Sequence, residues 1–350
     1  MSAVYSATKL TEFAEAISRA AGFGPKDATT LSTCLIDAEL RGVGSHGLVH
    51  LPMHIEELDR GLLKANPAVK TVKDSGPVVV LDGDSGLGQT LTIHATDLAI
   101  ERARQFGICT VAMRNSGSFG VAGYYPERVA AQNMIGFALQ NTAPHLAPHG
   151  AIDKLIGNNP FGIALPTGDV PIVLDIACSS VARASLHMAA KNNEKIPQEW
   201  AIDRNGEPTD DPKEALLGAL VPFGGHKGYG LALVLGLLSG PLLGLDDRTF
   251  TQTMYFPRPK GYGVVIIVFN IAHFVEFPVY LSGVQDWISR LRSARLAANA
   301  EPLRYPGERS HGLKERRKRE GIALPDAVVG DMQKLAQRFT HPFPNPVGAQ

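Results

Sequence analysis

Three histidines in the stretch SHGLVHLPMH have a spacing that could support metal or proton chemistry. His46, His50 and His54 recur every fourth residue, which would place their imidazoles along one face of a helix. Such a face could bind zinc. However, Pro52 interrupts the helix, and no carboxylate or cysteine at a matching offset completes a ligand set. We therefore expect no metal site here.

His46 has the surroundings of a proton-transferring group. Ser45 and Gly47 flank it, so its neighbourhood is polar and flexible, and the serine hydroxyl can hold the imidazole in one orientation. For His54 we expect a packing or surface role instead.

Two glycine-rich turns are candidates for binding an anionic ligand. The turn GDSGLGQ (83–89) lies between a predicted strand and a predicted helix, as a phosphate-binding turn does. Its G-x-x-G-x-G spacing is not the Rossmann fingerprint, and the next strand ends in Arg114 where the fingerprint requires an acid. The second turn, in VPFGGHKGYGLAL (221–233), places Lys227 among glycines at the start of an apolar helix. It offers free N–H groups and a cation to a phosphate or carboxylate.

Composition excludes several other classes of protein. Lys and Arg total 34, as do Asp and Glu, so nucleic acid and anionic membrane surfaces are not expected partners. Cys34, Cys109 and Cys178 form no C-x-x-C pair, which argues against disulfides and zinc ribbons and predicts a cytoplasmic setting. The longest apolar segment, Leu231 to Leu245, is broken by glycine and proline and is too short for a bilayer. We expect it to be a buried helix.

The elements that must position these residues fall into two regions. A chain of 350 residues has room for about two domains. Residues 1–76 and 301–350 show helical patterning, and we expect them to form one helical domain. Residues 77–300 alternate short Val- and Ile-rich strands with helical stretches, so the fold class is α/β or α+β, with a sheet-based cofactor-binding domain.

Taken together in chain order, these motifs resemble the type-II malate/L-lactate dehydrogenase family. That family also includes sulfolactate, ureidoglycolate and diketogulonate dehydrogenases and cyclic imino-acid reductases. The resemblance spans nearly the whole chain, in RGVGSHG (41–47), LDGDSGLGQ (81–89), RNSGSFGVAGYY (114–125), QNTAPHLAPHG (140–150), GNNPFGIALP (157–166), VLDIACSSVARA (173–184), EKIPQEWAIDRNGEPTDDP (194–212), GGHKGYGLAL (224–233) and PGE (306–308).

The resemblance implies an oxidoreductase that transfers a hydride between NAD or NADP and a small 2-hydroxy or 2-oxo acid. It implies a non-Rossmann cofactor domain with a largely antiparallel sheet, a helical domain from the two chain ends, and a homodimer. It assigns His46 as the catalytic proton donor and Ser45 as its orienting partner. The cofactor contacts that it implies are Thr142, Asp175, Ile176, Ala177, Cys178, Ser179, His226, Lys227, Gly228, Pro306, Gly307 and Glu308.

The sequence departs from the family at positions that contact substrate. His50 stands where relatives carry an arginine that clamps the substrate carboxylate, and Ser118 stands where many carry a histidine. Ala143 replaces an Asp that would support that histidine, and Ser185 replaces an Asp typical of the imino-acid reductases. We expect His50 and Ser118 to bind an altered substrate.

Two alternatives stay open at this point. One is an NADPH-dependent reductase of cyclic imino acids or N-alkyl imines, and the other is a catalytically silent binding homologue. The choice between NAD and NADP is also open, although Arg114 and Arg183 could bind a 2′-phosphate if they faced it.

Overall fold

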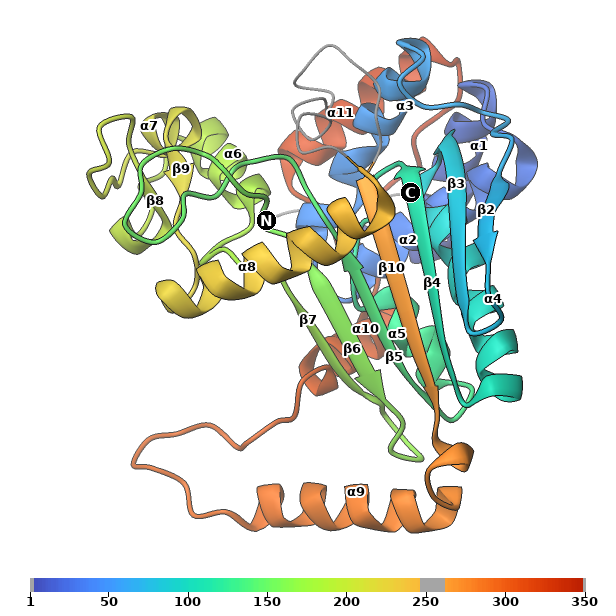
Figure 1. Cartoon of the computed structure of the whole chain (residues 1–350). Coiled ribbons are helices and arrows are strands. Elements are labelled where there is room, and N and C mark those ends of the chain that lie inside the picture. The colour runs from blue at the N-terminus through green and yellow to red at the C-terminus, as the bar shows by residue number, and fades with distance from the viewer. Residues whose placement is uncertain (1–2, 246–261, 349–350) are drawn as a thin grey trace.

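A seven-stranded sheet forms the centre of the molecule (Figure 1). The computed structural model describes residues 3–245 and 262–348. The strand order is β2-β3-β4-β10-β5-β6-β7, and within the described residues β3 and β4 are the one parallel pair. The strands are β2 (Lys70–Asp74), β3 (Val78–Gly86), β4 (Ile108–Ser116), β5 (Met134–Gln140), β6 (Phe161–Leu165), β7 (Ile172–Ile176) and β10 (Tyr262–Asn270). This topology confirms the prediction of a largely antiparallel, non-Rossmann α/β fold.

Helices cover both faces of this sheet because its central strands are apolar on both sides. In β4, Val111 packs against α4 and α5 on one face, while Ala112 packs in the cluster that contains α8 on the other. A small lobe beside α8 contains two further helices and a two-stranded sheet. The bounds are α4 (Gly88–Phe106), α5 (Tyr124–Ala130), α6 (Arg183–Asn192), α7 (Pro212–Leu217), α8 (His226–Ser239), β8 (Ala201–Ile202) and β9 (Ala219–Leu220).

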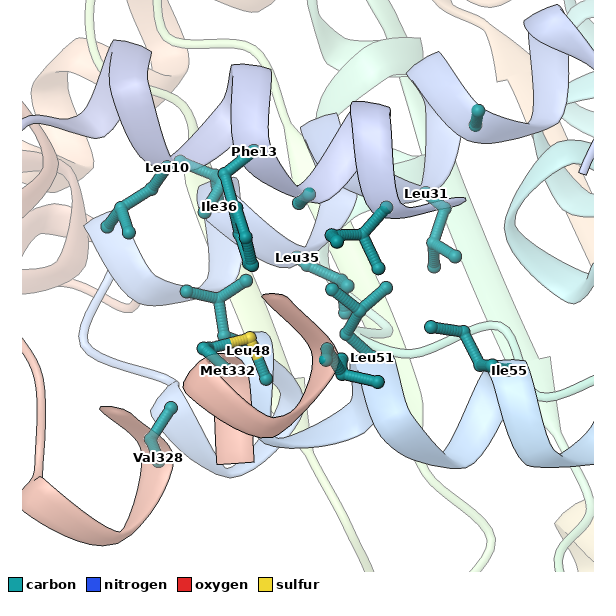
Figure 2. Close-up of a cluster of buried hydrophobic side chains, with 14 of the residues drawn as sticks. Leu10, Phe13, Leu31, Leu35, Ile36, Leu48, Leu51, Ile55, Val328 and Met332 are labelled. Atoms are coloured by element: carbon teal, nitrogen blue, oxygen red, sulfur yellow. The ribbon is translucent and has the colours of Figure 1, made fainter. Parts of the chain in front are cut away.

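The two ends of the chain share one core (Figure 2). Phe13 from the first helix, Leu35 from the second and Met332 from the last are all buried in it. The first strand pairs antiparallel with β11, which joins the ends again. These elements are β1 (Val4–Tyr5), α1 (Ala7–Ala20), α2 (Pro25–Leu40), α3 (Leu51–Asp59), α10 (Glu308–Glu320), β11 (Ile322–Ala323) and α11 (Asp326–Arg338).

Two features differ from the sequence prediction, and a third, an exposed helix, was not anticipated by it. Strand β2 lies in the predicted helical region but is the edge strand of the sheet. Helix α9 (Phe277–Ser293) lies at one end of the sheet (Figure 1), and none of its side chains is buried. The predicted buried helix in Leu231 to Leu245 is buried on one side only, since Val234 and Leu237 of α8 are 52% and 49% exposed. Among the described residues, no helix is long and apolar enough to span a membrane.

The glycine turn at 83–89 serves backbone packing. Gly117 N–H donates to the Gly86 carbonyl at 3.0 Å. A Cβ on Gly88 would lie 2.2 Å from the Ser118 carbonyl oxygen. The turn therefore fixes the loop that carries Ser118, because only glycine lets the two backbones approach this closely.

Candidate active site

A cavity of about 790 Å³ lies where α2, β7 and the start of α10 meet. It brings together residues that are far apart in the sequence, as predicted from the motifs. The predicted site residues that line it are Ser45, His46, Ser118, Thr142, Asp175, Ile176, Ala177, Ser179, Pro306 and Gly307.

His46 is carried by a short 3-10 turn, Gly44–His46, that follows α2. Ser45 Oγ lies 3.1 Å from His46 Nδ1. If the hydroxyl donates to Nδ1, the neutral imidazole carries its hydrogen on Nε2. Burial lowers the pKa of His46, because a protein environment solvates the imidazolium less well than water does. The group is therefore held in one orientation and favours its neutral form.

His50 braces the turn instead of facing the cavity. Its Nε2 donates to the Ser45 carbonyl at 2.8 Å, and its ring stacks on that of His46 with centroids 5.5 Å apart. Burial, together with the neighbouring His46 and His54, lowers its pKa to about 3, although the hydrogen bond to Ser45 opposes this. Among the described residues that line the cavity, His50 is not present. The geometry thus gives no direct support to its predicted contact with substrate.

The third histidine of the motif belongs to the protein interior. His54 is 2% exposed on α3, and its Nε2 lies 3.2 Å from Gln89 Nε2. No group of metal-binding side chains occurs in the part of the chain that the structure describes.

Ser118 reaches the cavity because Gln140 fixes its loop. The Phe119 N–H donates to Gln140 Oε1 at 3.2 Å, and Gln140 Nε2 donates to the Gly117 carbonyl at 3.1 Å. Both partners flank Ser118, so the buried amide of Gln140 at the end of β5 sets where this hydroxyl lies.

Thr142 is held by two asparagines of the GNNP motif. Its hydroxyl donates to Asn158 Oδ1 at 2.7 Å, and its N–H donates to Asn159 Oδ1 at 2.9 Å. The motif resemblance included these asparagines, but reasoning from the sequence gave them no role. Asn158 and Thr142 both line the cavity.

Asp175, at the end of β7, places a carboxylate in the cavity wall. Its side chain is open to the cavity, yet protein atoms surround it densely enough to raise its pKa to about 6. A hydrogen bond from Gly123 N–H and the charge of Arg41 oppose this increase. With one protein donor engaged, the carboxylate keeps acceptor capacity for a ligand hydroxyl.

The start of α8 packs against the segment Asp175 to Ser179. The Phe223 N–H donates to the Cys178 carbonyl at 3.0 Å, and a Cβ on Gly228 would lie 3.1 Å from that same oxygen. Cys178 is fully buried, and burial raises the pKa of its thiol to about 12, so it is unreactive. Within the described lining, Cys178, His226, Lys227 and Gly228 are absent.

The PGE motif lies beside β7 and extends the same wall. The Pro306 carbonyl accepts the Val173 N–H at 2.8 Å, and Gly307 begins α10 with a φ of +94°, which favours glycine. The Glu308 carboxylate is engaged elsewhere, by Arg292 at 3.1 Å and the Tyr305 N–H at 3.3 Å. Pro306 and Gly307 therefore face the cavity, while Glu308 supports the loop.

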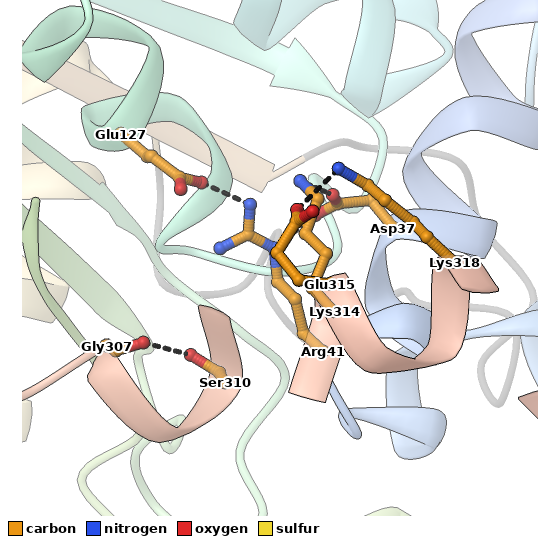
Figure 3. Close-up of polar contacts among 8 residues, drawn as sticks. All are labelled: Asp37, Arg41, Glu127, Gly307, Ser310, Lys314, Glu315 and Lys318. Atoms are coloured by element: carbon orange, nitrogen blue, oxygen red, sulfur yellow. Dashed lines mark hydrogen bonds and ion pairs between the residues drawn. The ribbon is translucent and has the colours of Figure 1, made fainter. Parts of the chain in front are cut away.

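Arg41 is a cavity residue to which the sequence analysis gave no role, although it begins the RGVGSHG motif. Its Nε donates to Asp37 and its Nη2 donates to Glu127, while Lys314 also binds Asp37 (Figure 3). This buried network joins α2, α5 and α10. Its partners are 86 and 277 residues apart, so no local pattern could have revealed it.

The two arginines considered for a 2′-phosphate are paired elsewhere. Arg114 Nε binds Asp82 at 3.0 Å, and Arg183 donates to His145 Nδ1. Of the described residues, the arginines that line the cavity are Arg41, Arg304 and Arg309.

The cavity has the size and lining of a cofactor and ligand site. Its volume is within the range of cofactor and ligand sites, which is about 300–1,000 Å³. Its walls combine backbone from glycine-rich loops, the hydroxyls of Ser118 and Thr142 and the Asp175 carboxylate. These groups can bind the hydroxyls and amide of a nicotinamide dinucleotide, and His46 shares the same space.

Comparison with known proteins agrees with this geometry. The profile of the family described as malate/L-lactate dehydrogenase matches residues 5–333. The L-sulfolactate dehydrogenase of Methanocaldococcus jannaschii is 37% identical over 319 residues, covering 91% of this chain and 92% of the relative. The (2R)-3-sulfolactate dehydrogenase (NADP(+)) of Chromohalobacter salexigens is 35% identical over 341 residues, covering 96% and 99%.

Solved structures show the same fold. The sulfolactate dehydrogenase structure from Methanocaldococcus jannaschii superimposes with a TM-score of 0.88 at 32% identity, covering 97% of this chain and 98% of that one. A delta1-piperideine-2-carboxylate reductase from Pseudomonas syringae pvar. tomato gives 0.85 at 27% identity, covering 95% and 99%. The chain therefore belongs to the malate/L-lactate dehydrogenase family.

Proposed function

We propose that the protein is an NAD(P)-dependent dehydrogenase that interconverts a small 2-hydroxy acid and the corresponding 2-oxo acid. The observation that carries this proposal is the position of the Ser45–His46 pair in one cavity with Asp175 to Ser179 and with Pro306 and Gly307. An acid/base group thus shares a space with the segments proposed to bind the cofactor.

His46 is the acid and base of this reaction. When bound, the dinucleotide supplies or accepts the hydride. In reduction, the imidazolium of His46 donates a proton to the substrate carbonyl oxygen, and in oxidation the neutral imidazole accepts the hydroxyl proton. Ser45 keeps Nδ1 engaged, so that Nε2 is the nitrogen that exchanges the proton.

The residues proposed to bind the cofactor belong to the segments that line the cavity. Thr142, Asp175 to Ala177, Ser179, Pro306 and Gly307 would hold the dinucleotide directly, while the buried Cys178 would support their segment. His226, Lys227 and Gly228, together with Glu308, would act by supporting these segments or by closing on the bound cofactor. The name of the relative from Chromohalobacter salexigens includes NADP(+), so both cofactors belong in the test.

The substrate carboxylate needs a cation other than residue 50. The imidazole of His50 is neutral near pH 7 and is hydrogen-bonded within the turn. Arg41, Arg304 and Arg309 are the guanidinium groups that the described cavity lining offers. Ser118 leaves more room than a histidine would. These features favour 2-hydroxy acids, and the corresponding 2-oxo acids, with an additional polar or anionic group, as in the sulfolactate and malate named for relatives.

We also infer that the protein is a cytoplasmic homodimer. Three free cysteines are consistent with a reducing compartment. The outer side of α8 exposes Val234, Leu237 and Leu238, and α9 has no buried side chain. A second copy of the chain would cover these apolar surfaces.

The test is a screen of pyruvate, oxaloacetate, sulfopyruvate and aromatic oxo acids with NADH and with NADPH. The His46→Ala variant should bind NADH with unchanged affinity, measured by fluorescence, while kcat falls by about 10²- to 10⁴-fold. Unchanged turnover would remove His46 from this role. Faster consumption of NADPH with cyclic imines would favour the imine reductase. Failure to bind either cofactor would favour a silent homologue.

A further inference from the structure

The turn that carries His46 curves around a buried carboxyl group. Two 3-10 turns, Gly44–His46 and Leu48–His50, follow each other and are joined at Gly47. Glu39, in the last turn of α2, is 5% exposed and reaches into the concave side of this double turn.

One hydrogen bond and two close approaches define the contact. Glu39 Oε1 accepts the Leu48 N–H at 2.9 Å. A Cβ on Gly47 would lie 2.1 Å from Oε1 and 2.4 Å from Cδ of Glu39, and a Cβ on Gly44 would lie 3.3 Å from Oε2. The carboxyl thus occupies the space of a side chain at position 47. This explains why glycine follows the histidine, since Gly47 has a φ of −90° and needs no left-handed conformation.

Glu39 is itself held from a third element. Arg317 of α10 donates to the Glu39 backbone carbonyl, and its charge acts on the carboxylate. Burial raises the pKa of Glu39 to about 7, while the Leu48 N–H and Arg317 oppose this increase. The carboxyl is a costly group to bury, and the backbone N–H of Leu48 donates a hydrogen bond to it.

We propose that Glu39 is the positioning residue of the catalytic turn, acting by steric and hydrogen-bond contact with Gly47 and Leu48 on the far side of His46. Glu39 is not among the described residues that line the cavity, so it acts through the backbone and not on the substrate. This inference rests on the proposed function for its kinetic consequence, but its structural part stands independently.

A double-mutant cycle tests the contact. Gly47→Ala adds a methyl group against the carboxyl, so kcat should fall by about 10²-fold, as expected when a catalytic group moves by about 1 Å. Glu39→Ala removes the obstacle but also the Leu48 anchor, and kcat should fall about tenfold by the same reasoning. In the double variant the methyl group has room, so Gly47→Ala should cost less than about threefold in the Glu39→Ala background. Equal costs in both backgrounds would overturn the proposal.

Two further variants keep the test decisive. Glu39→Gln keeps the shape and the acceptor oxygen, so kcat should stay within about threefold of wild type, whereas a drop as large as that of Glu39→Ala would contradict the proposed contact. Gly330→Ala is the matched control, since its added Cβ has no atom within 4 Å on α11. It should leave kcat unchanged.

Urea unfolding provides a readout that does not depend on the reaction. Gly47→Ala should lower the urea midpoint in the wild-type background and not in the Glu39→Ala background. If wild type reduces no oxo acid, the proposed function fails, yet the unfolding cycle still tests the contact. Additive midpoint shifts in that cycle would refute the role of Glu39 independently of activity.

Discussion

At the scale of single residues, the chemistry of the site depends on how the protein environment sets the pKa and the orientation of the His46 imidazole. Burial lowers its pKa, and Ser45 leaves only one ring nitrogen free to exchange a proton. The neutral form therefore predominates at pH 7, which suits oxidation, while reduction needs the minor imidazolium form. In its proposed role, His46 would serve both directions with opposite pH preferences.

This predicts a pH profile with a defined sign. The kcat/KM for oxo-acid reduction should fall as pH rises, with its midpoint below 6.5, the ordinary pKa of histidine, because the lowered pKa removes the proton earlier. Oxidation should lose rate as pH falls through the same midpoint. Steady-state rates from pH 4.5 to 9 measure both limbs. A midpoint above 6.5 in reduction would contradict the environment described for His46.

At the scale of elements, the buried ion network joins three helices at the edge of the cavity (Figure 3). Asp37 of α2 accepts from Arg41 and from Lys314 of α10, and Arg41 also binds Glu127 of α5. The side chains of Asp37 and Arg41 are 9% and 8% exposed. Charges so poorly hydrated depend on their partners, so the network fixes α2 beside the cavity.

Removal of one partner from this network should therefore lower the free energy of unfolding substantially. Asp37→Asn removes the carboxylate shared by Arg41 and Lys314, while Glu127 stays bound to Arg41, and we expect a loss of about 3–5 kcal/mol in the free energy of unfolding. The matched control is Asp97→Asn, which breaks a pair with Arg128 whose side chains are 47% and 48% exposed. That loss should be at most about 1 kcal/mol. Equal losses in urea unfolding would show that burial of the network is unimportant.

At the scale of the whole molecule, α9 is the element whose position is least explained by contacts within a single chain. It has 17 residues and no buried side chain, and its Trp287 is 69% exposed. A helix of this length gains most of its stability from burying an apolar face, so an isolated position is unfavourable. The proposed second copy would supply the missing contacts.

Oligomeric state gives the corresponding prediction. Wild type should sediment with twice the mass of the chain, and Trp287→Asp should shift the population toward monomer because a charge would replace an apolar contact. Lys195→Asp, at a site that is 82% exposed in the small lobe, is the control and should remain dimeric. A wild-type monomer at micromolar concentration would refute the homodimer.

The fold class could be predicted from the sequence alone, and the sequence also led to the proposal of His46 as the acid/base group. Strand and helix patterns depend on residues close together in the sequence, so they can be predicted from it. The motifs, taken in chain order, placed Ser45, His46 and the cofactor-binding segments in one predicted site. The structure then placed these residues in a single cavity. The glycine spacing at 83–89 differs from the Rossmann fingerprint, and this difference is visible in the sequence alone.

Only the tertiary structure decided which side chains face the cavity and which hold it in place. The His50 imidazole bonds to the Ser45 carbonyl, the Glu39 carboxyl lies against Gly47, and Arg41, which lines the cavity, binds Glu127, 86 residues away along the chain. Residue type and spacing could not reveal these roles. The direction of a side chain depends on which distant elements pack beside it, and that packing exists only once the chain is folded.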